Sequence, residues 1–150
     1  MKKILLSILA LTLAYSGFAF QSKTSGITAS VNAMSKGHKI IMQLTSKDTL
    51  AHKALMKSIN NILSISPDSK VEVVCHGPGL DILIKSKSLV SEQLTQLVSK
   101  GIVFVACEFS MKNMNVEKSM LLPAAGTVPA GVIEIVTKQE EGWSYIKAGF

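Results

Sequence analysis

The chain has 150 residues, 47% of them hydrophobic and 5% aromatic, and its formal net charge of +6 comes from lysine alone because the sequence contains no arginine. The lack of guanidinium groups and the scarcity of aromatic side chains argue against nucleic-acid binding, since phosphate and base recognition favour both. A chain of this length normally forms one compact domain with a core of its own, and no internal repeat is visible.

The N-terminus has the three-part pattern of a secretory signal peptide. Lys2 and Lys3 precede an apolar run at 4–14, and small residues follow it. The run falls short of the roughly 20 residues that span a bilayer, which argues against an uncleaved anchor. We therefore expect cleavage after Ala19 and export, with the periplasm as the expected compartment. Residues 20–37, rich in Ser, Thr, Gly and Ala, are expected to be a flexible lead-in.

Strand and helix patterns alternate beyond residue 38. The apolar run Lys39–Leu44 predicts a strand, and Asp48–Ser64 carries apolar residues at helical spacing. Pro67 and Asp68 are expected to end this helix. The β-branched run Val71–Cys75 then predicts a second strand.

The same order recurs in the second half. A short helical turn at Leu80–Ile84 precedes a helix at Val90–Lys100, which Gly101 ends as a C-cap glycine. The apolar run Ile102–Ala106 predicts a third strand. The remaining expected elements are short helical pieces at Ser110–Val116 and Glu117–Leu121, a brief strand at Gly126–Val128, a helix at Ala130–Glu141 and a last strand at Trp143–Lys147.

This alternation predicts the architecture. Continuously apolar strands separated by helices indicate a parallel sheet covered on both faces, so we expect a three-layer α/β/α fold with a mainly parallel sheet of about five strands. In such sheets ligands bind outside the carboxyl ends of the strands. The segments 76–79 and 107–110 follow the second and third strands and are therefore the candidate site.

Five motifs in chain order carry a family resemblance. They are HGPG at 76–79, FVACEFSM at 104–111, LLP at 121–123, VPAGV at 128–132 and QEEGWSYIK at 139–147. On these residues the chain resembles the DsrE/DsrF-like family from about Lys39 to Lys147, which predicts one DsrE/DsrF-like domain over residues 38–150.

The resemblance implies a Rossmann-like α/β/α subunit that commonly assembles into trimers or hexamers. Some members of the family have a cysteine that carries persulfide sulfur in a relay. The resemblance places Cys107 at the position of that cysteine. Two departures stand out. Relay members work in the cytoplasm with thiol partners, whereas this chain is expected to be exported. The basic residues that follow the cysteine in many relatives are represented here only by Lys112. Asn115 replaces a frequent Gly, which fits if the backbone there is left-handed.

The position of Cys107 gives its thiol a physical reason to be reactive. Amide groups and the dipole at the start of the following helix would stabilise a thiolate, which lowers the thiol pKa. Glu108 would oppose this if its carboxylate pointed at the sulfur. The alternative is that Cys107 is a small core residue at the end of an apolar strand.

The neighbouring segments supply the other candidate residues. His76 could donate a proton or orient a substrate beside Cys107, or it could simply cap its own loop. The amides of Gly77 and Gly79 could hold an anion, and Glu108 and Ser110 complete the candidate binding residues.

Other side chains give weaker signals. Cys75 and Cys107 could form a disulfide if their Cα atoms lie within about 7 Å, although Cys75 fits a packing role. Methionines at 111, 114 and 120 suit Cu(I), but their helical spacing favours core or interface positions. The isolated His38 and His52 are expected to be exposed to solvent. No metal or cofactor site is predicted.

Two hypotheses of function follow. In the first, the protein is an exported sulfur-handling protein in which Cys107 accepts sulfur as a persulfide and passes it to a partner protein. In the second, it is a non-catalytic binding or assembly module with structural cysteines. Both predict a homo-oligomer, a trimer or hexamer, and neither predicts contact with nucleic acid or, after cleavage, with the membrane.

Overall fold

The structure is a computed structural model that describes residues 37–149. The expected signal peptide at 1–19 and nearly all of the expected lead-in lie outside the described residues. Among the residues that are described, no helix has the length and apolar character needed to cross a membrane.

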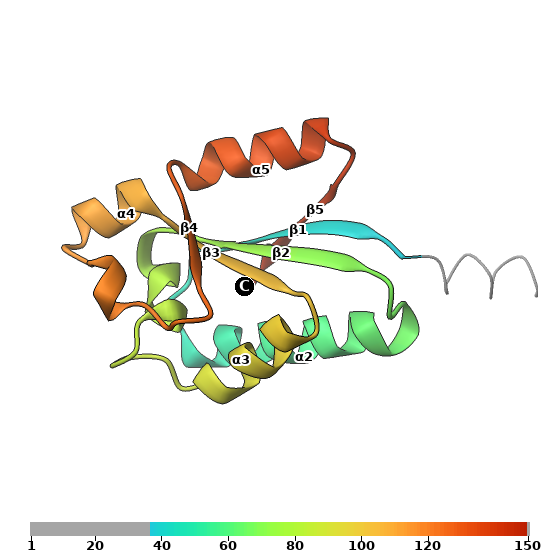
Figure 1. Cartoon of the computed structure of the whole chain (residues 1–150), viewed down its shortest axis with the longest axis horizontal. Coiled ribbons are helices and arrows are strands. Elements are labelled where there is room, and N and C mark those ends of the chain that lie inside the picture. The colour runs from blue at the N-terminus through green and yellow to red at the C-terminus, as the bar shows by residue number, and fades with distance from the viewer. Residues whose placement is uncertain (1–36, 150) are drawn as a thin grey trace, which may run out of the picture.

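A single sheet of five parallel strands forms the centre of the described part (Figure 1). The strand order is β4-β3-β2-β1-β5. The strands are β1 (Lys39–Leu44), β2 (Lys70–Cys75), β3 (Val103–Cys107), β4 (Gly126–Val128) and β5 (Ser144–Ala148). The predicted α/β fold is therefore confirmed, and the sheet is parallel throughout these residues.

Helices cover both faces of the sheet. Figure 1 shows α2 (Thr49–Ile65) and α3 (Ser91–Ser99) on one face and α5 (Gly131–Glu140) on the other. The short helix α4 (Glu108–Asn113) follows β3 directly, and two 3-10 helices, η1 (Gly77–Leu83) and η2 (Lys118–Met120), complete the fold. This is the three-layer arrangement that the sequence predicts.

The apolar core is divided by the sheet into a large and a small part. Side chains of β2 and β3 alternate between the two faces, as the period of a strand requires. Val73 and Phe104 pack toward α2 and α3, whereas Val74 and Val105 pack toward Ile135 of α5. This alternation decides which face each cysteine takes.

Several element boundaries differ from the predicted ones at the carboxyl ends of the strands. Strand β3 extends to Cys107, which pairs with Val128 of β4, and α4 begins at Glu108 instead of Ser110. The 3-10 helix η1 begins at Gly77, so the helical turn predicted at Leu80–Ile84 covers only its later part. The short segment after Cys107 lacks an apolar period, so its helix start could not be read from spacing. The thiol consequently lies at the junction between strand and helix.

Two residues with left-handed backbone agree with the sequence analysis. Gly101 has φ of 89° and follows the C-cap residue Lys100 of α3, the position at which a glycine with left-handed backbone ends a helix. Asn115 has φ of 54°, a conformation that asparagine tolerates better than most residues. The replacement of glycine at position 115 therefore preserves the backbone.

The prediction that His52 is exposed is wrong, whereas His38 is exposed as expected. His52 is only 3% exposed because it lies on the buried stripe of α2 beside Ala51, Leu55 and Met56. Its Nε2 atom lies 2.9 Å from the carbonyl oxygen of Ser46. A carbonyl can only accept, so Nε2 of His52 carries the proton, and this bond allows the imidazole to be buried.

Candidate functional site

Cys107 lies at the carboxyl end of β3, on the face of the sheet that α5 covers. Its side chain points the same way as that of Val105, two residues earlier, which packs in the cluster with Ile135. Cys107 is 5% exposed and its thiol is free. The two sequence segments chosen as the candidate site, 76–79 and 107–110, meet here through the hydrogen bond between Gly77 and Ser110.

Four neutral donors beside Cys107 favour its thiolate, although one of them, the amide of Phe109, also donates to the carbonyl of Pro129 over 3.4 Å. The donors are the amides of Gly131, Ser110 and Phe109 and the hydroxyl of Ser110. Burial of the thiol opposes ionisation, but these hydrogen bonds outweigh it and lower the pKa of Cys107 below its usual value. The three amides belong to the first turns of α4 and α5, where N–H groups have no partner within the helix.

Ser110 links the two sequence segments. The amide of Gly77 donates to Oγ of Ser110 over 2.9 Å, so Oγ acts as an acceptor toward η1. The hydroxyl hydrogen is then free to point at the sulfur, which agrees with the side-chain hydrogen bond from Ser110 to Cys107. The turn at HGPG therefore orients the donor that acts on the thiol.

Gly131 allows α5 to approach the sulfur closely. A Cβ atom built at this position would lie 3.0 Å from Cγ1 of Val74, 3.2 Å from Cβ of Cys107 and 3.5 Å from Cβ of His76. These distances leave little space for a side chain, so glycine permits the amide of residue 131 to reach the thiol. They also show that Cys107 and His76 flank the same backbone atom.

Glu108 does not act on the thiol in the way that the sequence left open. Its Oε1 atom accepts a 2.8 Å hydrogen bond from Thr127 and lies 3.2 Å from Nζ of Lys118. The hydrogen bonds from Thr127 and Lys118 lower the pKa of this carboxyl. Glu108 is not among the groups that shift the pKa of Cys107. Its carboxylate therefore serves the contact between α4, β4 and η2.

His76 belongs to a row of polar side chains that crosses the sheet away from Cys107. Its Nε2 atom lies 2.7 Å from Nε2 of Gln43 on β1, and the hydroxyl of Tyr145 on β5 donates to Oε1 of Gln43. The imidazole is half-buried, and this burial lowers the pKa of His76. Because the strands run in the order β3-β2-β1-β5, the distal nitrogen of His76 is bound on the side opposite to Cys107.

The amides of Gly77 and Gly79 both have acceptors within the protein. The amide of Gly77 donates to Ser110, and that of Gly79 donates to the carbonyl of His76 over 3.2 Å. A Cβ at Gly79 would lie 2.2 Å from the carbonyl oxygen of Leu44, so this glycine allows η1 to pack against β1. These groups shape the turn and orient Ser110.

Cys75 lies on the opposite face of the sheet from Cys107. It is fully buried among the side chains that pack toward α2 and α3, and burial raises the pKa of its thiol strongly. Both thiols are free, and the sheet lies between them. The arrangement agrees with the packing role expected for Cys75 and leaves Cys107 as the thiol with a lowered pKa.

The methionines near Cys107 have different surroundings. Met111 is buried in the core and Met114 packs against it, whereas Met120 is 44% exposed. Within residues 37–149, no group of three or more His, Cys, Asp or Glu side chains is arranged to hold a metal ion.

Three residues of the site were not identified from the sequence. Gly131 and Tyr145 lie within the motifs VPAGV and WSYIK, which the sequence analysis used for the resemblance alone. Gln43 is the polar residue in the otherwise apolar run IIMQL, and a buried strand has to satisfy such a side chain. That polar residue was the available signal.

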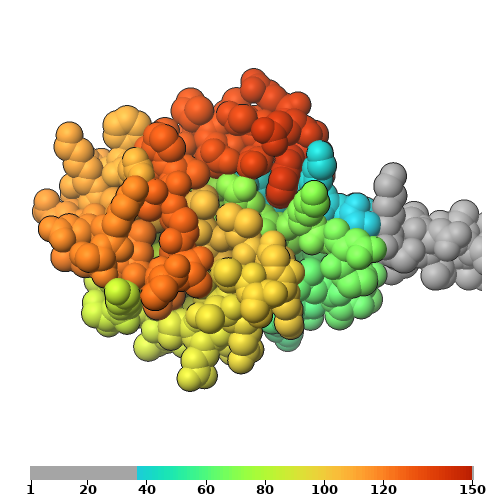
Figure 2. Space-filling view, in the orientation of Figure 1, coloured from blue at the N-terminus to red at the C-terminus, as the bar shows by residue number. Residues whose placement is uncertain are grey.

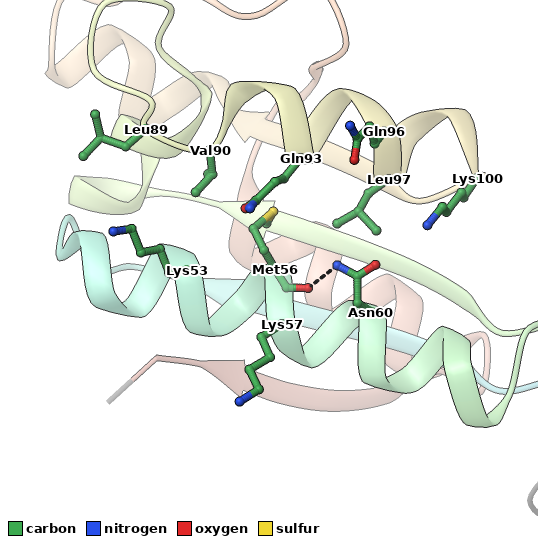
Figure 3. Close-up of a pocket in the computed structure, with 10 residues that line it drawn as sticks. All are labelled: Lys53, Met56, Lys57, Asn60, Leu89, Val90, Gln93, Gln96, Leu97 and Lys100. Carbon is green, nitrogen blue, oxygen red and sulfur yellow. Dashed lines mark hydrogen bonds between the residues drawn. The ribbon is translucent and has the colours of Figure 1, made fainter.

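A groove of about 430 Å³ lies on the other side of the molecule, between α2 and α3 (Figure 3). Met56, Val90 and Leu97 form its apolar floor, and the exposed Lys53 and Lys100 lie at its rim. The sheet separates this groove from Cys107, so its side chains do not contribute to the thiol site.

Comparison with known proteins identifies solved structures with the same fold and the family of this chain. The solved structure of a protein of unknown function from Methanobacterium thermoautotrophicum superposes with a TM-score of 0.71 at 25% sequence identity, covering 73% of this chain and 98% of that one. A second solved structure, of a conserved protein of unknown function from Bacteroides thetaiotaomicron, superposes with a TM-score of 0.50 at 17% sequence identity. The match covers 73% of this chain and 93% of that one, and it supports the fold alone. No curated protein matches the chain. The model of the DsrE/DsrF-like family matches residues 43–148, and the chain therefore belongs to the DsrE/DsrF-like family.

Proposed function

We propose that this protein is an exported sulfur-transfer protein in which Cys107 carries sulfur as a persulfide. The observation that carries the proposal is the set of four neutral donors around the Cys107 sulfur, which lowers the pKa of that thiol despite its burial. A thiolate is the nucleophilic form of cysteine, so such a site raises reactivity at neutral pH. Membership of the DsrE/DsrF-like family supports the same chemistry.

The transfer requires two displacement steps. In the first, the Cys107 thiolate attacks the sulfane sulfur of a donor persulfide, a sulfur–sulfur bond to Cys107 forms, and the donor leaves as a thiolate. In the second, an acceptor thiolate attacks the outer sulfur and Cys107 leaves as a thiolate. Each step exchanges one sulfur–sulfur bond for another, so no external oxidant or reductant is needed. The donors around the sulfur stabilise the anion that begins and ends the cycle.

Exposed apolar side chains beside the thiol support a protein partner. Phe109 of α4 and Val132 and Ile133 of α5 are 64%, 58% and 63% exposed. They are sequence neighbours of the donors Ser110 and Gly131, and α4 and α5 both lie at the surface (Figure 2). Apolar side chains grouped beside a reactive residue suit a docking protein, and a sulfur donor or acceptor protein would fill this role.

The same side chains favour self-assembly as the second candidate function. Val136 continues the exposed apolar face of α5, and a second copy of the chain could cover it. We propose a homo-oligomer, a trimer or hexamer, for either function. The signal pattern around Lys2 and Lys3 supports export to the periplasm, as a proposal.

Intact mass spectrometry of the natively purified protein tests the sulfur chemistry. The expected result is a gain of about 32 Da per sulfur that reductant removes and that Cys107→Ser abolishes, while Cys75→Ser retains it. A native Cys107 thiol that neither gains sulfur from a small persulfide donor nor reacts with iodoacetamide would contradict the proposal and favour the assembly module. Denatured protein, in which both cysteines react, provides the control for reagent activity.

A further inference from the structure

The row formed by Tyr145, Gln43 and His76 determines where the imidazole keeps its proton. The three side chains come from β5, β1 and the end of β2 and lie on the face of the sheet that α5 covers. They are joined by the hydrogen bond from the Tyr145 hydroxyl to Oε1 of Gln43 and by the 2.7 Å contact between Nε2 of Gln43 and Nε2 of His76. No step of the sulfur transfer described above uses this row.

The direction of each hydrogen bond follows from the orientation of the Gln43 amide, whose Oε1 faces Tyr145 and whose Nε2 faces His76. The Tyr145 hydroxyl donates to Oε1 of Gln43, which directs the amide nitrogen of Gln43 toward His76. An amide nitrogen can donate but not accept, so Nε2 of His76 has to accept. A neutral imidazole has one accepting and one protonated nitrogen, so the proton of His76 lies on Nδ1.

We propose that Gln43, held by Tyr145, is a positioning residue that keeps His76 neutral with its proton on Nδ1, so that beside Gly131, which Cys107 also flanks, His76 carries an N–H donor and is neither a base nor a cation. The tautomer stands on the row alone, whereas its use at Cys107 rests on the proposed sulfur transfer. The donors that already reach Cys107 are neutral too, so a neutral imidazole matches the rest of the site.

The surroundings of His76 agree with a neutral ring. Burial lowers the pKa of His76, and no charged side chain contributes to this shift. Among the described residues, the groups around His76 are Gln43 on β1, Tyr145 beyond it, and the backbone of Gly131 on α5, which Cys107 also flanks. None of them is an acid that would stabilise an imidazolium. Neutral His76 is therefore the expected form near pH 7.

Nitrogen-15 NMR of histidine-labelled protein measures the tautomer directly, and the chain contains its own reference. Nε2 of His52 faces the carbonyl of Ser46 and must be protonated, so His52 has the opposite tautomer from the one proposed for His76. The expected spectrum shows an unprotonated Nε2 for His76 and a protonated Nε2 for His52. A protonated Nε2 on His76 would overturn the proposal.

Gln43→Glu provides the sharpest variant. A carboxylate accepts and cannot donate, so Nε2 of His76 should become protonated, and the added negative charge should raise the pKa of His76. The pH profile of Cys107 alkylation should then gain a second ionisation that is absent from the parent protein. Gln96→Glu, an exposed residue of α3, is the matched control and should change neither readout.

Two further variants separate the row from the thiol. Tyr145→Phe removes the donor that orients Gln43, so both tautomers of His76 should appear while His52 stays unchanged. Cys107→Ser should leave the tautomer of His76 intact, because the row does not depend on the thiol. If sulfur transfer fails but His76 keeps its proton on Nδ1, the positioning role stands and the proposed function does not. If Gln43→Glu leaves the His76 tautomer unchanged, the positioning role is wrong whatever Cys107 does.

Discussion

The donors around Cys107 differ in how they can be tested. Three are backbone amides, whose removal would require changes to the main chain, whereas the hydroxyl of Ser110 can be deleted by one substitution. The Cys107 thiol also differs from the Cys75 thiol, because burial is the only effect that shifts the pKa of Cys75, and burial raises it. The lowered pKa of Cys107 therefore follows from the donors around this thiol and not from cysteine as a residue type.

Ser110→Ala should slow the alkylation of Cys107. The substitution removes one hydrogen bond to the thiolate and leaves the Gly77 amide without its acceptor, so the pKa of Cys107 should rise. A hydrogen bond to a charged group contributes about 1.5–3 kcal/mol, so we expect a roughly tenfold or greater fall in the rate at pH 7. The measurement is the rate of iodoacetamide labelling against pH.

The matched control for Ser110→Ala is Ser99→Ala, which removes an exposed hydroxyl bonded only within α3. It should leave the alkylation rate unchanged. An equal fall in both variants would mean that the effect is general and not transmitted through the Cys107 sulfur.

Gly131→Ala should weaken the site by a steric route. The new methyl group would lie 3.0 Å from Val74 and 3.2 Å from Cβ of Cys107, so the first turn of α5 has to move away from the thiol. The amide of residue 131 would then lose its hydrogen bond, and the pKa of Cys107 should rise. The alkylation profile against pH should shift upward.

Gly126→Ala tests whether any glycine replacement near the sheet has this effect. Its Cβ would meet Cγ1 of Val105 at 3.5 Å, an ordinary contact, so the pH profile should stay where it is. An unshifted profile in Gly131→Ala would instead show that α5 can adjust without releasing the sulfur.

At the scale of the elements, α5 is held to the sheet at both of its ends. Its first amide contacts Cys107, and its last turn carries Lys138, whose Nζ lies 3.5 Å from the buried Glu72 of β2 and 5.1 Å from the ring centroid of Trp143. The other carboxylate oxygen of Glu72, Oε1, is buried and has no hydrogen-bond partner among residues 37–149. A buried carboxylate that is only partly satisfied makes the packing of α5 on β2 sensitive to pH.

Glu72→Gln should reduce the pH dependence of stability. Burial, only partly offset by Lys138, raises the pKa of Glu72 in the folded state. A group with a raised folded pKa contributes stability that is complete below its unfolded pKa, about 4.3, and is lost as the pH rises through the folded value. The parent protein should therefore lose stability relative to Glu72→Gln as the pH rises above about 4, measured by urea unfolding.

Glu140→Gln is the control for this pH effect, since Glu140 is exposed on the same helix. Its unfolding profile should follow that of the parent protein across the pH range. A parallel shift in both variants would point to net charge as the cause and would argue against a specific role for buried Glu72.

Sequence patterns predict elements well where one physical signal dominates. The apolar spacing of α2 and the β-branched run of β2 come from burial on known faces, and both elements lie within one residue of their predicted bounds. The start of α4 was missed because EFSMKN has no apolar period, and its position depends on the pairing of Cys107 with β4. His52 was misplaced because a carbonyl partner allowed a polar ring to be buried.

The candidate site was predicted in the same uneven way. Gly77 and Ser110 could be placed together because the carboxyl ends of neighbouring parallel strands lie side by side. Gly131, Gln43 and Tyr145 are far from Cys107 in the sequence, and only the packing of α5 and the order of the strands bring them to one face. Local patterns carry no information about such long-range contacts.

At the scale of the whole molecule, the two faces of the sheet differ in how they meet solvent. The helices α2 and α3 close over the larger apolar core and expose Leu50 and Ile65 at the two ends of α2, whereas α5 presents Val132, Ile133 and Val136 together on its outer face. Exposed aliphatic side chains on one helix suit a contact between copies of the chain. The outer face of α5 is therefore the surface on which assembly should depend.

Ile133→Lys should lower the oligomeric mass of the protein. A charge placed in an apolar contact has to be desolvated, so association should weaken while the fold is kept. Light scattering after size-exclusion chromatography measures the mass. Leu89→Lys, which changes a 69% exposed side chain on the opposite side, should leave the mass unchanged. A monomeric parent protein at micromolar concentration would contradict the proposed assembly.

The separation of Cys75 from Cys107 by the sheet has a consequence for oxidative damage. An oxidant that reaches Cys107 converts its thiolate to sulfenic acid, which is normally rescued when a second thiol condenses with it to give a disulfide. Cys75 cannot act as that resolving thiol, because the backbone of the sheet lies between the two side chains. Repair of Cys107 must therefore come from another molecule, so its lifetime under oxidising conditions depends on the thiols around the protein and not on the protein itself.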